Sequence, residues 1–145
     1  MSQPSQPRRW LRSAAALFWG FLVVVVLSIG TDAALHAAGI FPALGKAMSD
    51  PLFLLATAYR TVYSILGSYV TARTAPDRPM QHALAGGVVG LVLSIAGAIA
   101  TWNRGPELGP HWYPLALVAT ALPCAWAGGS LRVRQIRSRA EFQQP

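Results

Sequence analysis

Four long apolar runs dominate the chain, and short stretches rich in proline, glycine and charge separate them. The runs cover residues 13–38, 51–72, 79–102 and 113–131. Each is about as long as, or longer than, the roughly 20 residues that an α-helix needs to cross a bilayer. They are continuous and do not alternate between apolar and polar positions, which excludes the strands of a membrane β-barrel. The pattern predicts an all-α, polytopic membrane protein, with residues 1–145 forming one membrane domain folded as a four-helix transmembrane bundle.

The stretches between the runs predict turns, because they contain residues that break helices. Gly39 follows the first run, Pro76 lies in the second connection, and residues 103–110 contain two glycines and two prolines. Such short connections require neighbouring helices to be antiparallel and in contact. The remaining segments, 1–12 and 132–145, are expected to form tails outside the bilayer.

Composition agrees with a membrane protein. Hydrophobic residues make up 53% of the chain and charged residues only 12%, whereas soluble domains carry about 25% charged residues. A formal net charge of +7 would indicate nucleic-acid binding in a soluble protein, but here the charge lies mainly in the short stretches between apolar runs. We therefore expect the lipid bilayer, and no nucleic acid, as the partner.

The distribution of basic residues predicts the orientation of the bundle, because cytoplasmic segments retain an excess of Lys and Arg. One side of the predicted bundle holds Lys46 and Arg104, whereas the other holds nine arginines. These are Arg8, Arg9, Arg12, Arg73, Arg78, Arg132, Arg134, Arg137 and Arg139. This positive-inside pattern predicts that both termini, the basic tail 132–145 included, are cytoplasmic. The protein is then a multi-pass protein of the inner, or plasma, membrane.

The first run also has features of a secretory signal, since arginines precede it and small residues such as Ala33 and Ala34 lie near its end. The apolar region of a signal usually spans about 7 to 15 residues, and this run is longer. We therefore expect it to stay in the protein as a membrane span. Cleavage would instead leave three spans and a periplasmic N-terminus.

Arg60 is the most informative residue, because it lies inside the second apolar run. A charged side chain at the bilayer centre costs about 2.5 to 3.5 kcal/mol on insertion scales. Asp32 in the first run is a matching acid, and helical rise places both residues about 12 Å below the outer ends of their runs. We expect an ion pair between them. His36 and Tyr63, each about one turn away along its helix, complete the predicted intramembrane polar cluster.

Two interpretations of this cluster are open. As a structural clasp, the acid and the base neutralise each other and fix how the first two helices pair. As a functional site, the cluster binds an anion or a lipid headgroup, or carries a proton. In another placement of the membrane, Asp32 lies at the outer headgroups and Arg60 reaches them by snorkelling. The clasp is favoured, because a transporter more often has several such residues and broken helices in related halves.

Small residues form a stripe along the third run. The stripe consists of Gly87, Gly90, Ser94 and Gly97. Steps of three and four residues place them on one face of a helix, and membrane helices associate through close contact over such small side chains. We expect this face to pack on small residues of the second run, including Gly67, with the third helix at the centre. Exposed small-residue faces would support a homo-oligomer or contact with another membrane protein.

The basic segment after the fourth run is expected to contact lipid. Its arginines, Arg132, Arg134, Arg137 and Arg139, are interspersed with apolar residues. Each arginine is worth about 1 kcal/mol near an anionic membrane surface. We therefore expect this segment to lie on anionic lipids of the inner leaflet.

No pattern in the sequence predicts catalysis, a metal site or a cofactor. Cys124 is the sole cysteine, and the three histidines are too scattered to bind a metal together. There is no nucleophile spaced with a base and no phosphate-binding glycine loop. We predict a non-enzymatic structural or accessory membrane protein, packed through small-residue faces. The alternative is a small transporter or channel subunit with a polar site at Asp32 and Arg60, and a membrane enzyme comes third.

The junction of the second and third runs resembles a known pattern. Residues 67–76 read Gly-Ser-Tyr-Val-Thr-Ala-Arg-Thr-Ala-Pro, residues 79–83 read Pro-Met-Gln-His-Ala, and Gly86, Gly87 and Gly90 follow. This is similar to uncharacterised small four-helix bacterial membrane proteins, in which a helix ending in Gly-Gly-Tyr and Ala-Arg meets a Gly-rich helix opening with His-Ala. Ser68 stands where the second glycine is common. The resemblance implies a bacterial inner-membrane protein with four helices, and it carries over no catalytic residues.

Overall fold

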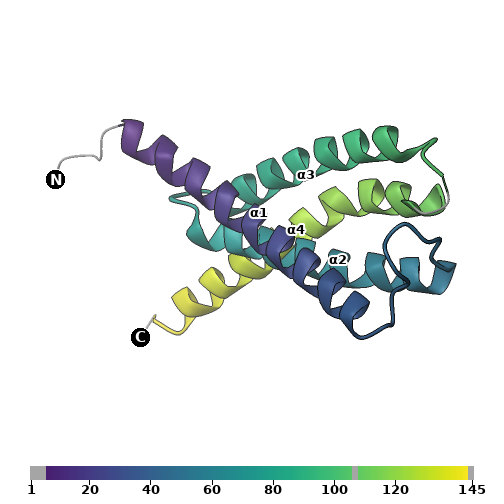
Figure 1. The fold of residues 1–145 in the computed structure, drawn as a ribbon. Coiled ribbons are helices and arrows are strands. Elements are labelled where there is room, and N and C mark those ends of the chain that lie inside the picture. Colours follow the sequence, from purple (N-terminus) through teal and green to yellow (C-terminus); the bar gives the residue numbers. More distant parts are fainter. Residues whose placement is uncertain (1–5, 106–107, 144–145) are drawn as a thin grey trace.

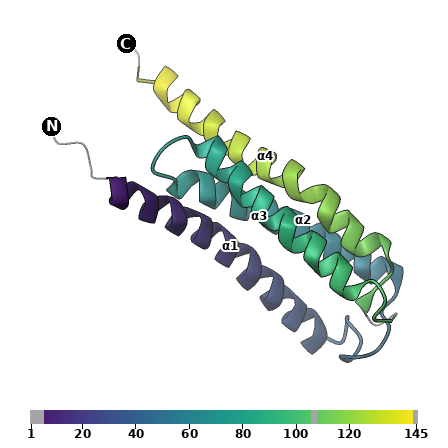
Figure 2. The same ribbon diagram turned by 90° about the horizontal axis from the view of Figure 1, so that it is seen from above.

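Helices make up the fold. The computed structural model describes residues 6–105 and 108–143, so parts of the predicted tails and of the turn at 103–110 lie outside the description. The described residues form four α-helices and no strand: α1 (Gln6–Ala37), α2 (Asp50–Thr74), α3 (Pro79–Thr101) and α4 (Trp112–Glu141). Consecutive helices run antiparallel (Figure 1 and Figure 2). The prediction of an all-α protein with four helices is confirmed.

Three of the four helices are long and apolar enough to cross a membrane. They are α1 from Arg9 to Ala37, α3 over its whole length, and α4. α2 differs because it carries Arg60 in its middle and several hydroxyl side chains, which lower its apolar content. These three helices identify a membrane protein by length and composition.

α1 and α4 are longer than the predicted spans. α1 begins at Gln6 instead of Ser13, and α4 continues to Glu141 instead of ending near Leu131. Their 32 and 30 residues extend over about 48 and 45 Å, whereas the hydrocarbon core of a bilayer is about 30 Å thick. Much of both predicted tails is therefore helical. The two extensions protrude at the end of the bundle where the termini lie (Figure 1).

Prolines explain the tight turn between α2 and α3. Ala75, which precedes Pro76, is extended with φ −58° and ψ 137°, because a following proline disfavours the helical conformation. Pro79 lies in the first turn of α3, where its missing N–H has no helical partner to lose. Arg78 lies between the two prolines with φ at 40°, a conformation that costs a non-glycine residue about 1 to 3 kcal/mol. Four residues therefore reverse the chain.

Small residues form the interior, and large apolar side chains face outward. Apart from Phe41 and Phe53, the buried apolar residues in the described ranges are alanines and Cys124. Large side chains along α1 and α3 are mostly exposed, including 62% of Ile29 and 74% of Ile99. Soluble monomers rarely expose apolar surface on this scale, whereas lipid tails accept it. The arrangement is typical of helices that meet through small residues within a bilayer.

The helices approach most closely where glycines meet. A Cβ added to Gly67 of α2 would lie 2.7 Å from the backbone oxygen of Gly20 in α1, and a Cβ added to Gly20 would lie 2.6 Å from that of Gly67. α4 presents Gly128 to the backbone of α2 in a similar way, whereas a Cβ added to Gly129 would meet the side chains of Met80 and Ala83 in α3. The backbone contacts at Gly20, Gly67 and Gly128 depend on the absence of a side chain.

α2, and not α3, occupies the central position. It packs on α1 and on α4 and also contacts α3, whereas α1 makes few contacts with α3 (Figure 2). The prediction that Gly67 packs on the third helix is wrong, because Gly67 faces Gly20 of α1. The packing role of Gly20 was missed, since a single glycine in a long apolar run gives no periodic signal. α3 pairs mainly with α4.

Candidate functional site

An ion pair joins α1 to α2. Arg60 Nη2 donates to Asp32 Oδ2 at 2.5 Å, and the hydroxyl of Tyr59 donates to the other carboxylate oxygen, Oδ1. Asp32 belongs to the last two turns of α1, and the two donors belong to the first half of α2. Because α2 supplies a donor to each carboxylate oxygen, the pair ties the two helices with charge-assisted hydrogen bonds, which are stronger than neutral ones.

Aromatic rings surround the Arg60 guanidinium. Its Cζ atom lies 6.0 Å from the centre of the Tyr59 ring and 5.8 Å from that of Tyr113, both within the range of cation–π attraction. Tyr113 opens α4, so a third helix contributes to the site. Tyr59 was expected to place a hydroxyl near Arg60, whereas sequence reasoning missed Tyr113 as a partner. Tyr113 lies near the start of α4, which runs parallel to α2, and this position at the same end of the bundle is the signal that could have identified it.

His36 and Tyr63 flank the ion pair without touching it. His36 Nδ1 lies 2.8 Å from the backbone oxygen of Asp32, and its ring packs edge-on against Phe41. The Tyr63 hydroxyl forms a hydrogen bond of 2.8 Å with Thr31 Oγ1. Of the four residues in the predicted polar cluster, the structure therefore joins Asp32 to Arg60 directly. His36 contacts the C-terminal end of α1 and Phe41 after it, and Tyr63 adds a hydrogen bond between α2 and α1.

The ion pair is only partly enclosed. The Arg60 and Asp32 side chains are 30% and 29% exposed. Arg60 Nε is nevertheless buried and has no hydrogen-bond partner in residues 6–105 and 108–143. The guanidinium therefore keeps unused donor capacity after it has bound the carboxylate, since an arginine carries five N–H donors.

A cleft begins at this ion pair. It has a volume of about 450 Å³ and is lined by residues from all four helices, within the range of about 300 to 1,000 Å³ typical of small-molecule sites. Apolar side chains from α1 and α3 form most of the lining, and α2 adds hydroxyls from Thr61, Ser64 and Ser68. Asp32 and Arg60 are the charged residues in its described lining.

The predicted stripe of small residues on α3 is divided between two environments. Gly87 packs against α4, where an added Cβ would meet the Cβ of Ala125. Gly90 and Gly97 have no atom within 4 Å of an added Cβ, so neither is a helix contact within the chain. Gly90 and Ser94 instead line the cleft. The prediction of one packing face therefore holds only at Gly87, where α3 packs on α4. The rest of this face has no helix packed against it.

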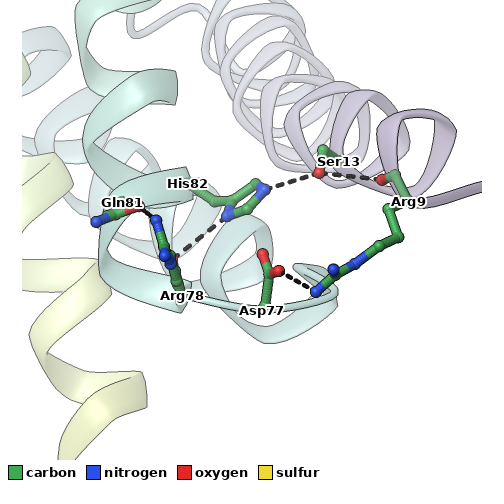
Figure 3. A network of polar contacts seen from close by, with 6 residues as sticks. All are labelled: Arg9, Ser13, Asp77, Arg78, Gln81 and His82. Carbon is green, nitrogen blue, oxygen red and sulfur yellow. Dashed lines mark hydrogen bonds and ion pairs between the residues drawn. The ribbon is translucent and has the colours of Figure 1, made fainter. Parts of the chain in front are cut away.

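A second polar network joins α1 to the turn before α3 at the opposite end of the helices (Figure 3). Arg9 forms an ion pair with Asp77 at 2.7 Å, and His82 Nε2 lies 2.9 Å from Ser13 Oγ. His82 Nδ1 also lies 3.3 Å from the backbone oxygen of Arg78. The sequence alone could not predict these contacts, because they require α1 to start well before the apolar run.

Basic residues gather at the end of the bundle that carries the termini. The start of α1, the α2–α3 turn and the end of α4 lie there (Figure 1). They contribute Arg9, Arg12, Arg73, Arg78, Arg132, Arg134, Arg137 and Arg139. Lys46 and Arg104 lie in the connections at the other end. Because residues 132–141 are helical, the four C-terminal arginines do not share one face of the segment.

The described residues hold no group of three or more metal-ligating side chains. Cys124 is buried in α4, with its Sγ 3.7 Å from the backbone oxygen of Thr61. In this position it acts as a small packing residue between α4 and α2.

No protein-family model matches the chain, and no curated protein or solved structure shows significant similarity to it. The resemblance to small four-helix bacterial membrane proteins therefore stays a prediction.

Proposed function

We propose that all four helices cross the bilayer of a bacterial inner membrane. α1 and α3 run in the same direction (Figure 2), and both are apolar enough to span. A chain that crosses twice in one direction must cross back in between, and α2 is the helix that connects them. The contact of Arg60 with Asp32 lowers the penalty for placing a charge in α2, because neither charge is left isolated.

Both termini are cytoplasmic in this proposal. The end of the bundle that carries the termini holds the arginines of α1, of the α2–α3 turn and of α4. Lys46 and Arg104 are the basic residues at the other end of the described bundle. This asymmetry supports the orientation, because cytoplasmic segments retain basic residues.

Cysteine labelling tests the topology. In a Cys124→Ala background, Lys46→Cys and Arg104→Cys are expected to react with a membrane-impermeant maleimide in intact cells. Thr74→Cys and Ser138→Cys are expected to react only after permeabilisation. Equal labelling of positions 46 and 74 in intact cells would show that α2 does not cross. Labelling of position 138 in intact cells would show that the C-terminus is outside the cell, which is the opposite orientation.

Within the membrane, the protein acts as a structural or accessory component and not as an enzyme. The observation that carries this proposal is the occupation of both Asp32 carboxylate oxygens by donors from α2. An acid whose oxygens are already bound has little capacity left for proton transfer, but it holds α1 in a fixed position. The pair is thus a clasp that keeps the bundle assembled.

A cycle of leucine variants tests the clasp. Arg60→Leu and Asp32→Leu each leave one charge without its partner. Each is expected to lower stability in mild detergent by about 1 to 3 kcal/mol, less than for a fully buried pair, because both side chains are partly exposed. The double variant removes both charges and is expected to recover most of that loss. Thermal unfolding of the parent and the three variants measures the coupling. Additive losses would contradict a clasp.

The alternative is a small transporter or channel subunit, and the cleft is the observation that favours it. Its lining combines apolar walls with one ion pair. If both single leucine variants unfold like the parent while a cellular phenotype disappears, the charges serve a ligand and the alternative replaces the clasp. Contact of the C-terminal arginines with anionic lipid, and self-association of the bundle, remain predictions.

A further inference from the structure

The cleft is elongated and has one polar end. Its α1 wall extends from Leu17 to Asp32, which corresponds to about 22 Å at helical rise. The α1 residues that line it recur every three or four positions, so they form one face of the helix. The opposite wall belongs to α3, where Gly90 and Ser94 leave space that larger side chains would fill. Such a shape, apolar along its length and charged at one end, matches an amphiphile.

We propose that this cleft binds one phospholipid molecule, with an acyl chain between α1 and α3 and the phosphate on the Arg60 guanidinium. The inference rests on the proposal that the helices lie in a bilayer. Asp32 is five residues from the end of α1, about 8 Å at helical rise. The polar end therefore lies near the outer headgroups, and a lipid of the outer leaflet enters with its chain directed inward.

The donors of Arg60 fit a phosphate. Nη2 binds Asp32 and Nε is buried, so Nη1, for which the described residues provide no hydrogen-bond partner, is the donor that remains for a phosphate. Arginine recognises phosphate oxygens through paired N–H donors. Because Asp32 neutralises the net charge, recognition depends on these donors more than on the overall charge of the lipid. Phosphatidylethanolamine and phosphatidylglycerol are thus expected to bind similarly.

Access from the bilayer favours a lipid as the occupant. The cleft has a volume of about 450 Å³. It is also open to its surroundings, because Phe21 and Leu93 in its walls are 51% and 50% exposed. An acyl chain from the bilayer can therefore enter between α1 and α3 without separating the helices.

Two matched glycine variants on α3 test the proposal. Gly90→Leu places a side chain in the cleft, whereas Gly97→Leu places the same side chain on open surface outside it. Detergent-purified protein is incubated with palmitoyl-oleoyl phosphatidylethanolamine, and native mass spectrometry counts the bound lipids. The parent and Gly97→Leu are expected to retain one lipid each. Gly90→Leu is expected to bind at least about tenfold more weakly.

A second measurement needs no variant. The parent is incubated with palmitoyl-oleoyl glycerol, which has the same chains without the phosphate, and is expected to bind it about tenfold more weakly than the phospholipid. Equal binding of the two lipids, or parent-like binding by Gly90→Leu, overturns the proposal. Because cysteine labelling reports topology independently, a parent that binds no phospholipid but shows the expected labelling pattern rejects the lipid site and leaves the four-span proposal intact.

Discussion

α1 has two neighbours, and they hold it in different ways. Along α2 it is in backbone contact at Gly20 and Gly67 and is clasped again at Asp32 and Arg60. Toward α3 the two helices separate, the cleft opens between them, and His82 at the start of α3 holds Ser13. The α1–α2 contact is thus closely packed, and we call the contact of Gly20 with Gly67 the seam. The α1–α3 contact instead encloses the cleft and is closed at one end by His82 and Ser13.

The difference shows what decides helix pairing here. Both α2 and α3 offer glycines to α1, but α2 also supplies donors to Asp32, the acid of α1. Small residues permit close contact without selecting a partner. A charge that must be neutralised selects one, because a single matching base is available at the same depth. The ion pair therefore explains why α1 pairs with α2 and leaves the small face of α3 free.

The largest effect is expected at the seam. Gly67→Ala places a methyl group 2.7 Å from the backbone oxygen of Gly20, and this oxygen cannot move without moving α1. Overpacking of this kind costs about 1 to 3 kcal/mol, and replacing glycine in a helix returns up to about 1 kcal/mol. Because the backbone oxygen is fixed, the cost lies toward its upper end, and we expect a net loss of about 2 kcal/mol. Thermal unfolding in detergent should show a clear loss of stability. A parent-like melting temperature would mean that the crossing is looser than the structure indicates.

The fold was largely predictable because its main signals are local. Apolar runs long enough to span, separated by proline and glycine, determine four helices and their antiparallel order. The helical extensions at residues 6–12 and 132–141 were not predictable in this way, because apolarity marks the membrane segment and not the end of the helix. Which helices touch was also partly missed, since it depends on the rotation of each helix about its axis.

A smaller loss is expected at the clasp. Tyr59→Phe keeps the ring beside Arg60 but removes the hydroxyl that donates to Asp32 Oδ1. A hydrogen bond to a charged group is worth about 1.5 to 3 kcal/mol when enclosed, and the partial exposure of this pair lowers the expected loss to about 1 kcal/mol. Tyr63→Phe is the control, because its hydroxyl binds Thr31 and not the acid. If the two variants lose equal stability, Tyr59 has no special role.

The candidate site was predictable only at its centre. One acid and one base in neighbouring apolar runs have few alternatives to each other, so the pairing of Asp32 with Arg60 follows from the sequence. The roles of His36 and Tyr63 did not follow, because one turn of helix can direct a side chain toward its own backbone or toward a neighbour. The cleft could not be predicted, since it results from the separation of two helices that are not adjacent in the sequence.

The exposed ion pair between Arg9 of α1 and Asp77 of the α2–α3 turn is expected to contribute less to stability than the clasp of Asp32 and Arg60. Arg9 and Asp77 are 52% and 43% exposed, and exposed ion pairs are worth about 0.2 to 1 kcal/mol. Arg9→Ala should therefore lower stability slightly, and raising the salt concentration should remove the difference from the parent, because salt screens exposed charges. Unfolding at low and high salt measures this. Arg60→Leu should differ from the parent at both salt concentrations, and a salt-independent loss in Arg9→Ala would show that its packing matters more than its charge.

Gly90→Ala makes on the open side the same change that Gly67→Ala makes at the seam. No atom lies within 4 Å of a Cβ at Gly90, so the methyl group has nothing to displace. Replacing glycine by alanine in a helix gains up to about 1 kcal/mol, and we expect the variant to melt at the parent temperature or slightly above it. A loss of stability equal to that of Gly67→Ala would mean that α1 and α3 close on each other in the folded protein. The cleft would then be absent, and the contrast between the two neighbours of α1 would fail at its open side.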